Sequence, residues 1–227
     1  MSIIFAMTII KDVVVTTTGF KDPKPGGDVF TVLNSVENVD TVMILDIRAT
    51  QENRVIDSGL VRKVVSEFGI SPIVGGGIAS YKDFESVLSS GASGVVLNSV
   101  AIPKHVEEAV DSFGRDTVVA AVDVRRYHGV ITSRIKSGTT GHPHRVDARG
   151  LVHDLSLAGV VSILLTSIDY DGGQCGYDLD TLCDILPYTK AKIIINGGAS
   201  CEDDMLSAFH YGASSFAARS MFLGGIK

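Results

Sequence analysis

Hydrophobic and polar positions alternate along the chain in short blocks, and no single periodic pattern runs through it. Eight blocks are rich in β-branched residues and almost continuously apolar, which is typical of strands covered on both faces, as in a parallel sheet. The predicted strands cover Ile3–Ile10, Thr41–Ile47, Ile70–Val74, Gly94–Leu97, Thr117–Asp123, Val161–Ser167, Ala191–Asn196 and Ser215–Ala218.

Helical patterns lie between these strands, with apolar residues spaced so that they share one face of each helix. The clearest cover Asp57–Phe68, Tyr81–Ser90 and Lys104–Phe113. Ser80 and Ser200 each precede a helix and are followed three residues later by Asp83 and Asp203, a spacing that predicts a capping box. Tyr127-His128-Gly129 predicts a small hairpin after the fifth strand.

The count of strands determines the expected fold. Eight strand–helix units in 227 residues leave roughly 28 residues per unit, which favours a barrel over a doubly wound sheet with a second domain. We therefore predict an α/β protein that forms one (β/α)₈ TIM barrel over residues 1–227. Its final helix should be short or absent, because the chain ends soon after the eighth strand.

Two segments of the chain repeat at nearly the same offset. Gly91-Ala92-Ser93 and Gly212-Ala213-Ser214 lead into the fourth and eighth strands, and their separation is 212 − 91 = 121 residues. Gly76-Gly77 falls on Gly197-Gly198 at the same offset. The repeat predicts two half-barrels of four units each, at about residues 1–114 and 115–227.

Composition excludes several classes of protein. The net charge is −6 and no basic stripe occurs, so nucleic acid is not an expected partner. No apolar run reaches the roughly 18 residues of a membrane span, and the expected location is the cytoplasm. Three cysteines without a CxxC pair indicate neither a disulfide framework nor a zinc site. His142-Pro143-His144 lacks a third ligand, so neither metal nor cofactor is predicted.

Two glycine-rich turns predict binding of phosphate. Gly75-Gly76-Gly77 follows the third strand and Gly197-Gly198-Ala199 follows the seventh, each directly before a helix. Such turns let backbone N–H groups approach an anion closely at a helix N-terminus. Asn98-Ser99 and Arg219-Ser220 end the next strands and add side-chain donors. Two such sites imply a ligand with a phosphate at each end, whereas the alternative is that the glycines only make tight turns.

Acidic and polar residues gather where strands end, which is the catalytic face of a barrel. The candidates there are Asp46, Asp123, Thr166, Asp169, Asp171 and Asn196. For Asp46, chemistry and a structural rim salt bridge both stay open. Asp123 follows a fully apolar run, which favours acid–base chemistry. Matching the first strand with the fifth places Thr8 opposite Asp123, and a threonine hydroxyl cannot act as a general base near neutral pH.

Several stretches together resemble a known family. Leu45-Asp46-Ile47, Val74–Ile78, Ala121-Val122-Asp123, Leu164–Gly172 and Gly176-Tyr177-Asp178 are similar to HisF, the cyclase subunit of imidazole glycerol phosphate synthase. The resemblance implies a barrel that takes ammonia from a HisH-like glutaminase at its amino-terminal face. It further implies that the ammonia crosses the barrel and is added to a bisphosphorylated ribulosyl substrate.

The resemblance also implies roles for individual residues. Asp123 would be one catalytic acid–base, and one phosphate would be held by Gly77, Asn98 and Ser99. The other phosphate would be held by Asp171, Gly172, Gly198, Arg219 and Ser220. The family has a small residue where Arg219 stands.

Three further features of the chain depart from the family pattern. Its second catalytic aspartate falls on Thr8, and its substrate-clamping lysine falls within Thr16-Thr17-Thr18. Its charged ring at the barrel floor falls on the uncharged residues Ser2, Thr41, Gly94 and Ser162.

A branch of the family is more similar still. Phe20–Lys24, Gly27-Asp28 and Asp46–Arg54 resemble HisF-like proteins associated with surface-polysaccharide biosynthesis. That branch implies ammonia transfer from a HisH-like glutaminase to a separate sugar amidotransferase, without cyclase chemistry. Two alternatives stay open: a genuine cyclase of histidine biosynthesis, and an inactive barrel that only binds a bisphosphate.

Overall fold

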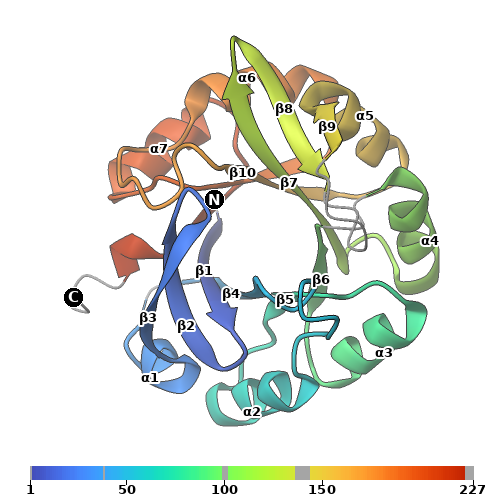
Figure 1. Cartoon of the computed structure of the whole chain (residues 1–227), viewed down its shortest axis with the longest axis vertical. Helices are drawn as coiled ribbons and strands as arrows, with labels where there is room; N and C mark the ends of the chain where they lie inside the picture. The colour runs from blue at the N-terminus through green and yellow to red at the C-terminus, as the bar shows by residue number, and fades with distance from the viewer. Residues whose placement is uncertain (1, 38, 99–101, 136–143, 223–227) are drawn as a thin grey trace.

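A closed ring of eight parallel strands forms the centre of the computed structural model, which describes residues 2–37, 39–98, 102–135 and 144–222. Each strand pairs with the next, and β12 pairs with β1 to close the ring (Figure 1). In ring order the strands are β1 (Ser2–Ile10), β4 (Thr41–Asp46), β5 (Ile73–Gly75), β6 (Gly94–Leu97), β7 (Val118–Tyr127), β10 (Ser162–Ser167), β11 (Lys192–Asn196) and β12 (Ser215–Ala218). The predicted single (β/α)₈ barrel is confirmed.

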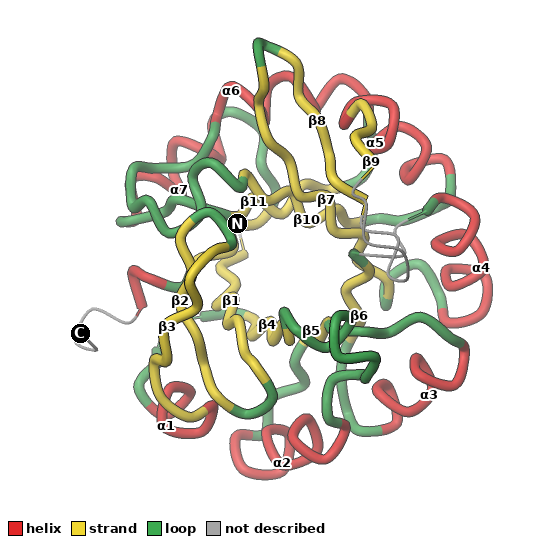
Figure 2. Tube along the Cα trace, viewed as in Figure 1, coloured by secondary structure: helices red, strands yellow, loops and turns green. Residues whose placement is uncertain are grey.

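Helices form an outer ring around the strands (Figure 2). They are α1 (Val29–Asn34), α2 (Ser58–Phe68), α3 (Tyr81–Ser89), α4 (Pro103–Phe113), α5 (Ala148–Leu157), α6 (Leu179–Ile185) and α7 (Glu202–His210), with 3₁₀ turns η1 (Leu186–Tyr188) and η2 (Ser220–Phe222). After β12 the described part of the chain contains only η2. None of the helices in the described ranges is long and apolar enough to cross a membrane.

The apolar core has two layers, because successive side chains of a strand point to opposite faces. The outer layer lies between strands and helices and includes Phe5, Met7 and Phe216. The inner layer fills the barrel itself and consists of Ile4, Ala6, Met43, Val96, Val119, Ala121, Leu164, Ile194 and Ala217.

The two predicted helix starts have different outcomes. Ser80 caps α3 in a capping box with Asp83, as predicted. The prediction for the later helix is wrong by one residue. Cys201 is the N-cap of α7, and Asp204 accepts hydrogen bonds from the N–H groups of Ser200 and Cys201 at 2.7 and 3.2 Å. Asp204 is thus the acidic residue of the capping box, in place of the predicted Asp203.

An antiparallel pair of strands extends β1 and another extends β7. β2 (Val13–Thr18) and β3 (Lys21–Asp28) follow β1, while β8 (Val130–Ile135) and β9 (His144–Asp147) follow β7. The predicted hairpin at Tyr127-His128-Gly129 is confirmed, since Tyr127 pairs with Val130. Both pairs lie at the carboxyl ends of parallel strands and flank the same face of the barrel (Figure 1). Both predicted halves therefore begin with a parallel strand that is followed by an antiparallel pair. The boundary near residue 114 stays a prediction.

Candidate functional site

A ring of polar side chains lines the mouth of the barrel at the carboxyl ends of its strands. The alternation that points Ile4, Val119 and Ala217 to the axis continues toward the mouth. It adds Thr8, Asn98, Asp123, Thr166, Asn196 and Arg219 to the inward-facing set. Six strands thus bring six polar groups to one opening.

Asp123 is the carboxylate of this ring. The Nδ2 group of Asn98 donates to its Oδ2 at 2.6 Å, and the Thr166 hydroxyl also donates to it. Burial removes water from the charged carboxylate and raises the pKa of Asp123 to about 6. The negative charge of Asp171 also raises this pKa, whereas the hydrogen bonds from Asn98 and Thr166 lower it. A carboxyl with that pKa can both donate and accept a proton near neutral pH.

Neighbouring strands extend the hydrogen bonds around Asp123. Thr166 pairs with Asp123 in the register of β10 and β7. The Nδ2 group of Asn196 donates to Thr166 Oγ1 at 3.2 Å. Asn98, Asp123, Thr166 and Asn196 therefore form one polar chain over β6, β7, β10 and β11.

The wall of the mouth opposite Asp123 carries the guanidinium of Arg219, next to Thr8. Thr8 on β1 lies four strands from Asp123 in either direction around the ring. Its hydroxyl donates to the carbonyl of Val15 at 2.7 Å and accepts from Arg219 Nη1 at 2.8 Å. Burial lowers the pKa of Arg219, and the negative charge of Asp171 opposes this effect. The Thr8 hydroxyl therefore binds the guanidinium of Arg219.

The two glycine turns lie on opposite sides of the same mouth. They follow β5 and β11, which are four strands apart in the ring. Within the described residues, the N–H groups of Gly77 and Ile78 and of Gly198 and Ala199 meet no protein acceptor. Both turns can therefore present N–H groups to an anion, as the sequence predicts.

The same glycines are also required by close packing. Gly77 and Gly198 have φ angles of +67° and +101°. A Cβ atom on Gly77 would overlap the carbonyl oxygen of Arg54, and one on Gly198 would overlap that of Gly176. Tight turns and anion binding are thus not exclusive here, because one glycine serves both.

Asp171 and Gly172 lie beneath the β2–β3 pair. The Thr17 hydroxyl and the Phe20 N–H donate to Asp171 Oδ2 at 2.9 and 3.3 Å. A Cβ atom on Gly172, whose φ is +71°, would overlap the Thr17 carbonyl oxygen. Together these contacts hold the pair of strands against the loop after β10.

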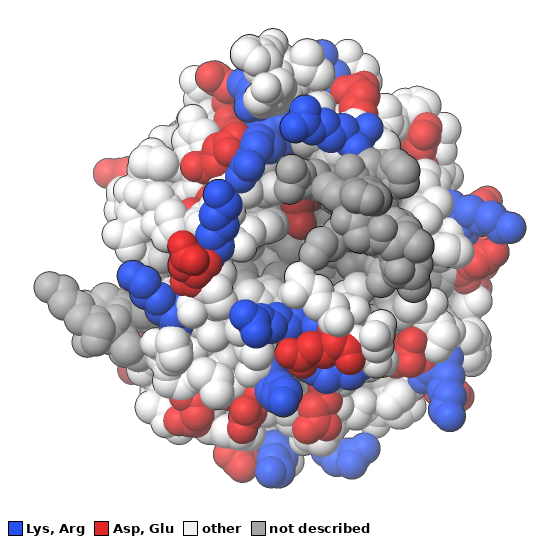
Figure 3. Space-filling model, in the orientation of Figure 1, with Lys and Arg blue, Asp and Glu red and all other residues white. Residues whose placement is uncertain are grey.

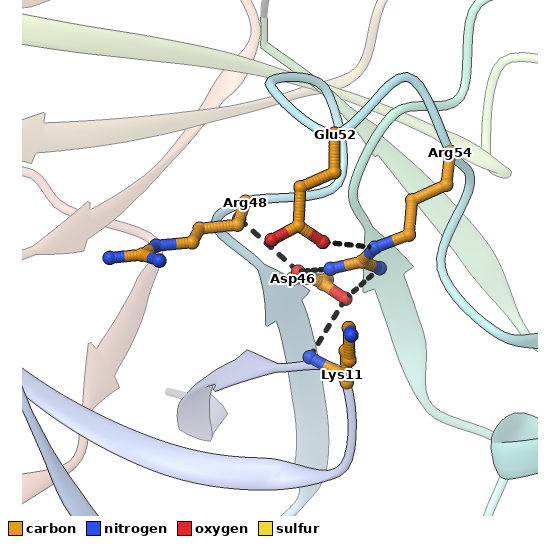
Figure 4. Close-up of polar contacts among 5 residues, drawn as sticks. All are labelled: Lys11, Asp46, Arg48, Glu52 and Arg54. Carbon is orange, nitrogen blue, oxygen red and sulfur yellow. Dashed lines mark hydrogen bonds and ion pairs between the residues drawn. The ribbon is translucent and has the colours of Figure 1, made fainter.

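Asp46 has a different environment from Asp123, although both end apolar runs. It follows Ile44 and Val42 of the outer core layer, so its side chain faces the loops outside the ring. Arg54 binds it through both Nη atoms, and the N–H groups of Lys11 and Arg48 each donate to it at 3.2 Å (Figure 4). Protein donors thus occupy both oxygens, which favours the structural interpretation of Asp46.

Asp169 belongs to an exposed ion-pair network at the rim. Arg125 Nε contacts its Oδ1 at 2.9 Å, and the N–H group of Arg126 donates to its Oδ2 at 3.3 Å. Arg126 also pairs with Asp184 at 2.9 Å. Basic side chains form an arc over β7 to β9 at this edge of the mouth (Figure 3). The rim thus presents positive charge, although the chain is acidic overall.

Some predicted residues lie outside the described ranges or carry no assigned contact. Ser99 and His142-Pro143 fall outside those ranges. Ser220 begins η2 and lines a pocket with Asp171, Gly172, Gly198 and Ala199. Among the described residues, no group of three or more histidine, cysteine, aspartate or glutamate side chains could hold a metal ion.

Sequence reasoning missed the contact between Thr8 and Arg219 and the role of Arg54. The first joins positions 211 residues apart, and no local pattern signals it. For Arg54, a signal does exist. Asp46 and Arg54 flank a short polar loop, where an acid and a base could have been paired.

Comparisons with known proteins identify the family of the chain. The family model described as "Histidine biosynthesis protein" matches residues 2–226. The chain belongs to this family. It is similar to a protein from Metallosphaera sedula named "Imidazole glycerol phosphate synthase subunit HisF", 36% identical over 231 residues, which cover 98% of this chain and 90% of that protein. Proteins of the same name from Thermotoga sp. (34% identical, covering 92% of this chain and 83% of that protein) and Natranaerobius thermophilus (35%, covering 82% and 74%) are also similar. The predicted resemblance to HisF is confirmed.

Proposed function

We propose that this member of the family is a HisF-like synthase subunit that passes ammonia without completing the cyclase reaction. A HisH-like glutaminase would supply the ammonia, and a sugar of surface-polysaccharide biosynthesis, acted on by a separate amidotransferase, would receive the nitrogen. The observation that carries this proposal is the asymmetry of the mouth: Asp123 on one wall faces Thr8, bound to Arg219, on the other.

Acid–base chemistry explains why this asymmetry matters. The cyclase implied by the resemblance uses a carboxylate on each wall, and one positioned acid or base contributes typically 10²–10⁴-fold in rate. Thr8 offers a hydroxyl that cannot take a proton near neutral pH, and Arg219 beside it cannot act as a base either. Of Asp123, Thr8 and Arg219, Asp123 is the group whose pKa of about 6 suits proton transfer near neutral pH.

We propose that a small neutral molecule crosses the barrel interior, and the polarity of its lining supports this. Its inner layer is apolar, and the floor positions Ser2, Thr41, Gly94 and Ser162 are small and uncharged. Ammonia crosses such a lining as the neutral species, whereas ammonium would have to leave water. We propose that these residues form the entrance on the glutaminase side.

The test supplies the purified chain with ammonium and the bisphosphorylated ribulosyl substrate of the cyclase. We expect little or no turnover, and no growth of a histidine auxotroph that carries this chain in place of its own cyclase subunit. The chain should bind a HisH-like glutaminase from the same genome and accelerate its glutamine hydrolysis. Robust cyclase turnover would overturn the proposal.

A genuine cyclase is the second candidate, and the names of the relatives favour it. In that case a water molecule held at Thr8 would replace the missing carboxylate. Turnover with ammonium together with growth of the auxotroph would establish this candidate and exclude the first.

A further inference from the structure

Within the residues that the structure describes, Arg219 has no counter-ion in contact. Its Nη1 donates to Thr8 Oγ1 at 2.8 Å and to the Val15 carbonyl at 3.2 Å. Its Nε is buried and has no acceptor in the described part of the chain, where no carboxylate lies within ion-pair distance of it either. Asp171 acts on it only as a nearby charge.

Arg54 shows what a structural arginine looks like in this chain. It binds the Asp46 carboxylate through both Nη atoms and Glu52 through Nε at 2.7 Å. Burying a charge that has no partner is unfavourable, because the charge leaves water without gaining a counter-ion. Arg54 has carboxylate partners within the protein. Arg219 has none among the described residues, so an anion from outside the protein could be its partner.

The pocket beside Arg219 offers further donors. It is lined by Thr8, Asn196, the Gly197–Ala199 turn, Arg219 and Ser220. The N–H groups of Gly198 and Ala199 have no protein acceptor within the described residues. A guanidinium is planar and binds the two oxygens of a carboxylate or phosphate as a fork.

We propose that Arg219 is the specificity-determining residue of the mouth and that Thr8 is its positioning residue. Thr8 holds the guanidinium at the wall of β1 and β12, so that the site selects a ligand carrying an oxyanion against that wall. This inference rests on the proposed use of the mouth as the ligand site, but not on the identity of the nitrogen acceptor. One consequence is specific: a carboxylate introduced at position 8 would pair with Arg219 and occupy the site from within.

The test is calorimetric titration of the full chain at constant ionic strength, with inorganic phosphate in one arm and acetate in the other. We expect one arm to show binding, and the arm that does so identifies the oxyanion. Arg219→Gln should weaken that binding at least tenfold, and Arg219→Lys by less. Arg115→Gln removes an equal charge from an exposed position and should leave the affinity unchanged.

Variants of Thr8 test the positioning role. Thr8→Asp should weaken binding at least tenfold, and adding Arg219→Gln to it should cause no further loss, because both remove the same guanidinium from the ligand. Thr8→Val should weaken binding several-fold and Thr8→Ser should restore it. If Thr8→Asp does not fold, Thr8→Val and Thr8→Ser still decide the point.

Three results would overturn the inference: binding of neither anion by the unaltered chain, unchanged affinity in Arg219→Gln, or tighter binding in Thr8→Asp. Cyclase turnover by the unaltered chain would refute the proposed function and leave these affinities unaffected. The two failures are therefore distinguishable.

Discussion

Asp46 and Asp123 each end an apolar run, and the sequence around them is similar, yet the fold uses them in opposite ways. The side chain of Asp46 points to the same side of its strand as the outer core layer. Both Nη atoms of Arg54 and the N–H groups of Lys11 and Arg48 donate to its oxygens. Asp123 has the parity of the inner layer, and its pKa is raised to about 6. A difference of one residue in strand register thus separates a carboxylate that holds loops from one that can move a proton.

The largest expected effect is on the structural side. Asp46→Ala leaves the Arg54 guanidinium without its main partner and releases the N–H groups of Lys11 and Arg48. We expect a loss of about 3–4 kcal/mol in the free energy of unfolding, the lower part of the range for a broken buried ion pair, since Arg54 keeps Glu52. Urea unfolding measures it. Glu52→Ala is the control, with little change, and an equal effect of both variants would refute the assignment.

The glycine turn beside Asp46 gives the next effect. Gly77 and Gly69 share a φ of +67°, but a Cβ atom meets the Arg54 carbonyl at Gly77 and nothing within 4 Å at Gly69. Gly69→Ala should cost about 1 kcal/mol from backbone strain alone. Gly77→Ala should cost about 2–3 kcal/mol, because a backbone overlap is added. Equal losses in thermal unfolding would show that the close approach does not exist.

Asp123→Asn should act in the opposite direction on stability. The folded pKa of Asp123 lies above its ordinary value of 3.8, so the carboxyl stabilises the fold when protonated, and this contribution is lost as the pH rises from about 4 through 6. At pH 7 the variant should gain at most about 3 kcal/mol, since one pKa unit corresponds to about 1.4 kcal/mol. The gain should vanish below pH 4. A loss of stability at pH 7 would contradict this.

The smallest effect concerns Asn98. Its amide donates to the ionised Asp123 carboxylate and so lowers the pKa of Asp123. Asn98→Ala should therefore raise that pKa further, by less than about one unit. Asn34→Ala on the surface of α1 is the control and should leave it unchanged. A fall in the pKa of Asp123 in the Asn98 variant would show that the amide does not donate to it.

The sequence predicted the barrel well because its strands carry their own signal. All eight predicted strands occur, since a strand covered on both faces must be apolar throughout. The β2–β3 pair was missed because Lys21–Asp28 is polar and contains Pro25, as an edge strand may. The predicted cap at Ser200 and Asp203 was one residue early, because the helix begins after Cys201 and the acid three residues beyond that cap is Asp204.

The site was predictable in outline only. Strand ends placed Asp123, Asn98 and both glycine turns at one face, because parallel strands end together. Successive side chains of a strand point alternately into and out of the barrel. Asp123 therefore points inward, whereas Asp46 points outward. The pairing of Thr8 with Arg219 depends on closure of the ring, which brings the first strand beside the last.

The most direct test of the lone proton-transfer carboxylate is a pH titration of Asp123 by carboxyl carbon NMR, with Asp123→Asn to assign the resonance. We expect a midpoint of about pH 6. A midpoint at or below 3.8, the ordinary value for aspartate, would contradict it, because a carboxylate ionised throughout the neutral range could not serve as a proton donor at the mouth.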